Sequence, residues 1–159
     1  MKGAFDISSL TRKLKLDNFN HKKSFFGEHL LARYPTHTIA IVESEKSAVI
    51  ASICRHAFPN LVWLATGSKQ SLNVAHLETI GKGRKLILYP DGDAFDQWRK
   101  VAEEARGKGN SVVVSQLINT YSSNEEKLAG MDIADYLVRH LRRANEENGC
   151  APRVPVIRR

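Results

Sequence analysis

Residues 85–93 read KLILYPDGD, a short apolar run that ends in an aspartate, a glycine and a second aspartate. The run is β-rich and lacks the polar–apolar alternation of a half-exposed strand, so it predicts a strand buried on both faces. Three further runs of this kind occupy residues 38–42, 61–65 and 111–114. The four runs together predict a mainly parallel sheet.

Longer stretches with helical character separate the four runs. They lie at about residues 45–57, 71–80 and 94–108, and a last one follows at about 132–147. Alternation of strands and helices produces right-handed βαβ units. We therefore predict an α/β fold, a Rossmann-like sandwich with a four-stranded, mainly parallel central sheet flanked by helices.

The chain of 159 residues fits one domain with terminal extensions. We expect a lead-in over residues 1–37, the α/β domain over 38–147 and a basic tail over 148–159. Residues 1–37 carry seven basic and three acidic residues, residues 138–159 carry six and two, and residues 38–137 carry eleven and twelve. Basic ends around a near-neutral centre fit a polyanionic partner, although solvated termini would give the same pattern.

Two classes of protein are disfavoured by composition. No apolar run approaches the roughly 20 residues that span a bilayer, and the N-terminus lacks a secretory signal pattern, so we expect a cytoplasmic protein without a membrane partner. Cys54 and Cys150 lie far apart and form no CxxC pair. The sequence therefore carries no zinc signature and no disulfide framework.

Acidic side chains follow the predicted strands, where ligands collect in open parallel sheets. Glu43 follows the first strand, Asp91 and Asp93 follow the third, and Asp132 begins the last helix. A few hard oxygen donors suit Mg²⁺ (or Mn²⁺), with Gly92 relieving the backbone where metal and ligands crowd together. Taken separately, Asp91-Gly92-Asp93 could be a turn with an N-cap, and Glu43 could merely begin a helix. Their joint placement favours a metal site.

Four segments resemble, in the same order, the motifs of the Toprim domain found in bacterial DNA primases and in primase-like proteins of mobile elements. Residues 41–48 resemble the first motif, an apolar strand that ends in Glu and runs into a helix, and residues 86–93 resemble the strand that ends in Asp-x-Asp. Residues 64–68 are similar to the Gly-Thr/Ser turn of those primases, and residues 130–137 resemble their Gly-Lys-Asp-Pro-Asp-Glu-Tyr-Leu stretch. The resemblance covers about residues 38–140.

The resemblance implies a Toprim-like fold and magnesium-dependent nucleotidyl or phosphoryl transfer on nucleic acid, in DNA replication or mobile-element transfer. It implies that Asp91 and Asp93, with Asp132, hold the metal ion, and that Glu43 completes the site or acts as a general acid/base. The candidate phosphate contacts are Lys46, Gly67, Ser68, Lys69 and Lys85. The expected partners are single-stranded DNA or an RNA primer, nucleotides and other replication domains or proteins.

The chain departs from the primase pattern at several positions. Ser44 and Ser47 stand where primases usually have Gly and Asp after the first-motif Glu, so one carboxylate is missing. Ala134 stands in the place of the second Asp of the last motif, and Phe95-Asp96 replaces the usual Ala-Gly. Three interpretations stay open: a primase-type nucleotidyltransferase domain, which we rank first, a Toprim-family metal-dependent nuclease, and a non-catalytic nucleic-acid-binding module.

Overall fold

The four apolar runs form one sheet in the computed structural model, which describes residues 13–14, 24–54 and 57–148. All neighbouring strands are parallel and lie in the order β2-β1-β3-β4. The strands are β1 (Thr38–Val42), β2 (Leu61–Ala65), β3 (Leu86–Leu88) and β4 (Val112–Val114). The predicted α/β class and the four-stranded parallel sheet are confirmed.

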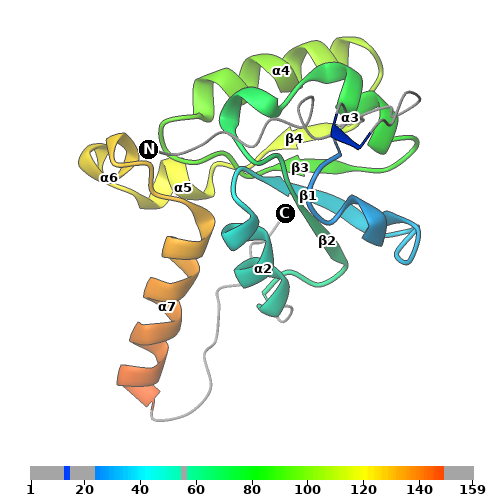
Figure 1. The fold of residues 1–159 in the computed structure, drawn as a ribbon. Coiled ribbons are helices and arrows are strands. Elements are labelled where there is room, and N and C mark those ends of the chain that lie inside the picture. Colours follow the sequence, from blue (N-terminus) through cyan, green and yellow to red (C-terminus); the bar gives the residue numbers. More distant parts are fainter. Residues whose placement is uncertain (1–12, 15–23, 55–56, 149–159) are drawn as a thin grey trace.

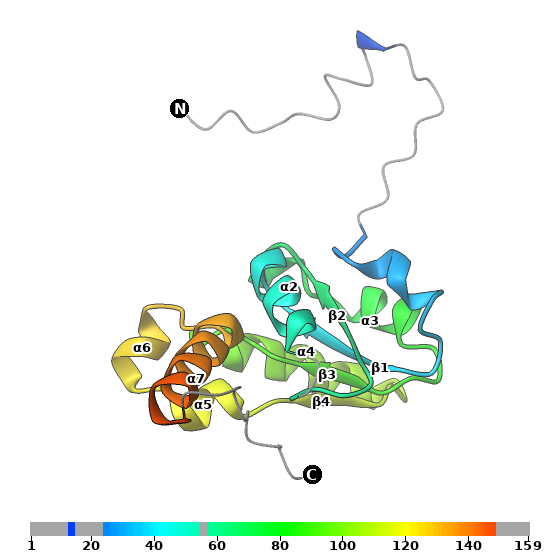
Figure 2. The same cartoon turned by 90° about the horizontal axis from the view of Figure 1, so that it is seen from below.

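Helices cover both faces of this sheet, which gives a three-layer sandwich (Figures 1 and 2). One layer contains α3 (Val74–Ile80) and α4 (Phe95–Gly107), and the other contains α2 (Glu45–Ile53), α5 (Leu117–Tyr121) and α7 (Ile133–Asn148). The short elements are η1 (Glu28–Leu31), η2 (Lys69–Ser71) and α6 (Asn124–Leu128). Within the described ranges, no helix combines the length and the apolar composition needed to cross a membrane.

Strand β1 explains why the apolar runs lack alternation. Ile39 and Ile41 pack into the α3–α4 layer, whereas Ala40 and Val42 pack into the α2–α7 layer, and all four side chains are fully buried. A central strand between two helical layers must be apolar on both faces. Trp98 of α4, also fully buried, fills the first of these two cores.

Several predicted boundaries differ from the observed ones. The strands over residues 38–42 and 61–65 are confirmed, while the helix predicted from residue 71 begins at Val74. It begins there because the side chain of Asn73 accepts a hydrogen bond from the His76 N–H at 2.9 Å and so caps the helix. Helices α5 and α6 were not predicted, because five residues are too few to reveal a helical period.

The described part of the lead-in is fastened to the edge of the sheet. Phe26 and Ala65 exchange two backbone hydrogen bonds of 2.8 and 3.1 Å. A Glu28 carboxylate oxygen accepts the Phe25 N–H at 2.8 Å and lies 2.9 Å from Nε2 of His76, on which the Phe25 ring stacks. These contacts make the segment from Phe25 onward part of the folded body.

Gly92 allows helix α6 to approach the turn that follows β3. A Cβ atom at this position would lie 2.5 Å from Cα of Lys127 and 2.9 Å from the Lys127 carbonyl oxygen. The Gly92 N–H also donates to the Met131 carbonyl at 2.9 Å. We expected this glycine to relieve crowding around a metal ion, but the crowding comes from the backbone of α6.

We expect Gly92→Ala to lower the free energy of unfolding by about 1–3 kcal/mol, because backbone atoms rather than a flexible side-chain end would have to move. Urea denaturation measures this change. Gly107→Ala in α4 is the matched control, since nothing lies within 4 Å of a Cβ atom there, and it should be neutral or slightly stabilising. An unchanged midpoint for Gly92→Ala would show that α6 does not pack against the turn.

Candidate functional site

The carboxyl edge of the sheet brings together the acidic residues that follow β1 and β3. Glu43 directly follows β1, Asp91 follows β3 after two residues, and these strands are neighbours in the sheet. Ser44, rather than Glu43, is the N-cap of α2, since its Oγ accepts the Ser47 N–H at 3.1 Å. Glu43 therefore lies outside the helix, at the strand end.

Asp91 has a strongly perturbed carboxyl group. Burial raises its pKa to about 8, with further contributions from the nearby carboxylates of Glu43, Asp132 and Asp93. Its Oδ1 atom is buried and has no hydrogen-bond partner among the residues that the structure describes. A buried carboxylate oxygen without a partner is costly unless a proton or a cation neutralises it. Below a pH of about 8 a proton neutralises this carboxyl group, and a cation at Oδ1 could replace that proton.

Asp93 points to a lysine rather than to the helix that follows it. The N-cap of α4 is Ala94, without a side-chain capping bond, so the interpretation of Asp93 as a helix cap is wrong. Asp93 instead forms an ion pair with Lys69, and this hydrogen bond raises the pKa of the lysine. The turn itself is present, because the Ala94 N–H donates to the Asp91 carbonyl at 3.0 Å.

The backbone of Lys69 is attached to helix α4 by two hydrogen bonds. Its carbonyl oxygen accepts hydrogen bonds from the indole N–H of Trp98 and from the side-chain amide of Gln97, both at 3.2 Å. Because Trp98 is completely buried in α4, the loop after β2 is attached to that helix. The indole of this buried residue thereby also positions the loop that carries Lys69.

Asp132 is a buried carboxylate whose two oxygens both have partners. Oδ2 lies 2.8 Å from the Ser47 hydroxyl and 2.9 Å from Nζ of Lys46, and Oδ1 accepts the Asp135 N–H at 2.9 Å. Burial acts to raise its pKa, but the hydrogen bonds from Asp135, Lys46 and Ser47 outweigh burial and the pKa is lowered. The expected metal ligand thus caps α7 and ties this helix to α2.

Ser47 stands where the resemblance leads one to expect an aspartate, and its surroundings explain the difference. Its side chain is fully buried and contacts both Ser44 Oγ and Asp132 Oδ2 at 2.8 Å. A carboxylate at this position would face Asp132 and repel it. This contact could not be predicted from the sequence, because Ser47 and Asp132 are 85 residues apart.

The remaining candidate phosphate contacts lie at opposite ends of the strands: Gly67 and Ser68 follow β2, whereas Lys85 precedes β3. Gly67 has a φ of 80° and its N–H donates to the Glu43 carbonyl at 2.8 Å, so this amide is not free for an anion. Ser68 lies in the same loop, with its hydroxyl 2.7 Å from that of Ser71. Lys85 immediately precedes β3, at the opposite end of the strand from Asp91, so the structure does not bring it to the site.

The carboxylates do not form a ready-made metal-binding group. In the described part of the chain, no three His, Cys, Asp and Glu side chains are arranged to hold a metal ion. The pairing of Asp93 with Lys69 and of Asp132 with Lys46 accounts for this arrangement. The two lysines pair with the flanking carboxylates, and within the described residues neither Glu43 nor Asp91 forms an ion pair with a basic side chain.

Comparison with known proteins gives one match. Residues 2–92, more than half of the chain, match the model of a protein family described as a domain of unknown function, DUF6371. The match extends from the N-terminal segment to the turn after β3. No curated protein and no solved structure matches the chain.

Asp91 predicts that the metal-free chain loses stability as the pH rises. The carboxyl group has a pKa of about 8 in the fold against 3.8 ordinarily, so the folded state holds the extra proton between these values. The associated stability is present at low pH and is lost as the pH rises from about 4 through about 8. Asp91→Asn, which stays neutral, should remove part of this decline.

The measurement is urea denaturation in EDTA at a series of pH values. Asp96→Asn is the control, because the Asp96 side chain is 82% exposed, and it should leave the pH dependence unchanged. Equal slopes for the wild type and Asp91→Asn would contradict the assignment.

Removal of the Ser47 hydroxyl should weaken the link between α2 and α7. We expect Ser47→Ala to lower the free energy of unfolding by about 1.5–3 kcal/mol, since a buried charged acceptor loses a donor. Ser52→Ala in the same helix is the matched control, because the Ser52 hydroxyl bonds to a carbonyl of its own helix, that of Ala48. Thermal unfolding of both variants, compared with the wild type, measures the effect; equal losses would argue against a special role for Ser47.

Proposed function

We propose that this chain, which belongs to the DUF6371 family of domains of unknown function, is a Toprim-like module of a primase-like protein that binds a divalent metal ion and acts on nucleic acid. The observation that carries the proposal is the orphaned oxygen of Asp91 at the carboxyl edge of the sheet, in a carboxyl group whose pKa is raised to about 8. Open parallel sheets bind ligands at this edge.

The charge balance of the site supports one divalent ion. The inner carboxylates are Glu43, Asp91, Asp93 and Asp132, and the ammonium groups paired with them are those of Lys46 and Lys69. When all are ionised, two negative charges remain uncompensated. Mg²⁺ and Mn²⁺ carry this charge, prefer oxygen ligands and accept a site with one or two carboxylates completed by water and phosphate.

The residues present fit such an ion at Glu43 and Asp91, with Asp93 as a third ligand if Lys69 releases it. Asp132 is not included, because its oxygens are taken by Ser47, Lys46 and the Asp135 amide. When bound, a divalent ion there supplies charge shielding for a phosphate group. This assignment gives one ion per chain.

The chain's own residues provide the phosphate contacts. The side chains of Lys46 and Lys69 are 57% and 31% exposed and lie on either side of the carboxylates. Both can extend toward a phosphate at the carboxyl edge while their backbones stay fixed. Glu43, at the end of the central strand β1, is placed to accept or return a proton from a hydroxyl group of the substrate.

One observation favours a second candidate, a non-catalytic nucleic-acid-binding module. The two lysines already neutralise Asp93 and Asp132 without a metal ion. A site with built-in counter-charges could persist as a structural ion-pair network that contacts phosphates through the same lysines. The two candidates differ in whether nucleic-acid binding depends on a divalent ion.

We expect a titration with Mn²⁺, followed by calorimetry and by electron paramagnetic resonance, to show one saturable site in the wild type. Asp91→Asn and Asp93→Asn should weaken binding at least tenfold, since each removes an anionic ligand. Asp96→Asn is the matched control and should bind like the wild type, because Asp96 lies on the exposed face of α4. A fluorescent single-stranded DNA should then bind more tightly with Mg²⁺ than with EDTA.

The outcomes separate the candidates. Metal binding that Asp91→Asn and Asp93→Asn leave unchanged would overturn the metal site, and DNA binding equal in Mg²⁺ and EDTA would favour the non-catalytic module. Cleavage of the labelled DNA by the chain alone, lost in Asp91→Asn, would favour the nuclease alternative. Extension of a primer would favour the nucleotidyltransferase.

A further inference from the structure

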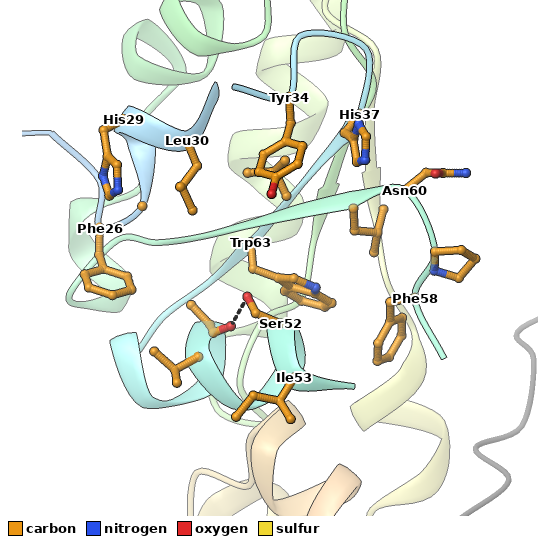
Figure 3. A pocket seen from close by; sticks show the side chains of 16 residues that line it. Phe26, His29, Leu30, Tyr34, His37, Ser52, Ile53, Phe58, Asn60 and Trp63 are labelled. Atoms are coloured by element: carbon orange, nitrogen blue, oxygen red, sulfur yellow. Dashed lines mark hydrogen bonds between the residues drawn. The ribbon is translucent and has the colours of Figure 1, made fainter. Parts of the chain in front are cut away.

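An apolar groove lies beside the edge strand β2, away from the carboxylates. Its volume is about 720 Å³, and its walls come from α2, from the segment around η1 and from the residues that lead into β2 (Figure 3). No Asp, Glu, Lys or Arg side chain lines it, and its polar side chains are those of His29, Tyr34, His37, Ser52 and Asn60. The hydroxyl of Ser52 is already bonded to the Ala48 carbonyl. The groove therefore suits an apolar polypeptide surface better than a charged ligand.

Three side chains on the walls of the groove are apolar and uncovered. Phe26 is 46% exposed, Val49 is 48% exposed and Ile53 is 75% exposed. Val49 and Ile53 are four residues apart on α2 and so share one helical face. Isolated exposed apolar side chains are ordinary, but three around one cavity indicate a surface that another segment covers.

The N-terminal segment of the same chain carries a matching apolar pattern. Ile7, Leu10 and Leu14 follow one another at spacings of three and four residues, a sequence pattern that predicts one apolar face if the segment is helical, with Arg12 and Lys13 off that face. Leu14 is itself 58% exposed. The groove and Leu14 thus each present apolar surface without cover.

Two further observations favour this segment over a separate partner. The family match begins at residue 2 and runs through the groove-lining residues, so the segment and the groove belong to one family unit. Eleven residues separate Leu14 from Phe26, a tether that reaches up to roughly 40 Å when extended. A tethered segment competes at an effective concentration on the order of millimolar, which an untethered partner rarely reaches.

We propose that residues 5–14 bind in this groove through Ile7, Leu10 and Leu14, against Phe26, Val49 and Ile53. The mode is that of an amphipathic helix in an apolar groove. Docking covers the outer face of α2 and the edge of β2. It brings Arg12 and Lys13 close to a groove that no Asp, Glu, Lys or Arg side chain lines. The proposal does not depend on the metal site.

Hydrogen exchange followed by mass spectrometry tests the proposal on the intact, metal-free chain. We expect the amides of residues 5–14 to exchange at least tenfold more slowly than an unstructured peptide. Ile53→Glu and Leu10→Glu should each abolish this protection, and the double variant should lose no more than either single one. Since Ile53 is 75% exposed, its replacement should leave the circular dichroism melting curve of the body intact.

Leu128→Glu is the matched control, because Leu128 is 83% exposed on α6 and does not line the groove; it should retain the protection. Exchange of residues 5–14 at the unstructured rate in the wild type, or protection that survives Ile53→Glu, would overturn the proposal. Protection that grows with protein concentration, with sedimentation as a dimer, would assign the groove to a second copy and would also overturn it.

Discussion

The buried carboxylate of Asp132 holds α2 and α7 together at the carboxyl edge of the sheet. It receives hydrogen bonds from Ser47 and Lys46 on α2 and from the first turn of α7. A buried carboxylate is tolerated only when its oxygens are hydrogen-bonded, and removal of one donor costs about 1.5–3 kcal/mol. Helices α2 and α7 must therefore keep their relative position, which fixes the start of α2 and, with it, Glu43 at the end of β1.

The other half of the site depends on a close backbone contact. The turn that carries Asp91 and Asp93 lies directly against α6, and Gly92 leaves room for the Lys127 backbone. Trp98 holds the loop of Lys69 from the opposite side of the sheet. Loops that carry charged groups are thus fixed by packing on rigid elements, which is what a precise binding site requires.

The sequence predicted the sheet well because apolar runs buried on both faces leave a clear pattern, as at residues 38–42. It also placed Glu43 and Asp91 at one edge, since parallel strands share their carboxyl ends. It did not predict which carboxylates would be neutralised, because the pairing of Lys46 with Asp132 joins residues distant in the chain. Nor did it distinguish crowding by a metal ion from crowding by α6 at Gly92, since both demand a residue without a side chain.

The distribution of the chain's two tryptophans gives it two separate optical reporters. Trp98 is fully buried and bonded through its indole N–H to the loop of Lys69, whereas Trp63 is 4% exposed and lies on the wall of the groove beside Phe58 and Tyr89. The fluorescence emission of Trp63 should respond to occupancy of the groove, and the emission of Trp98 should respond to rearrangement of the loop that carries Lys69. Single-tryptophan variants would therefore allow events at the two ends of β2 to be followed independently, in real time and without an attached dye.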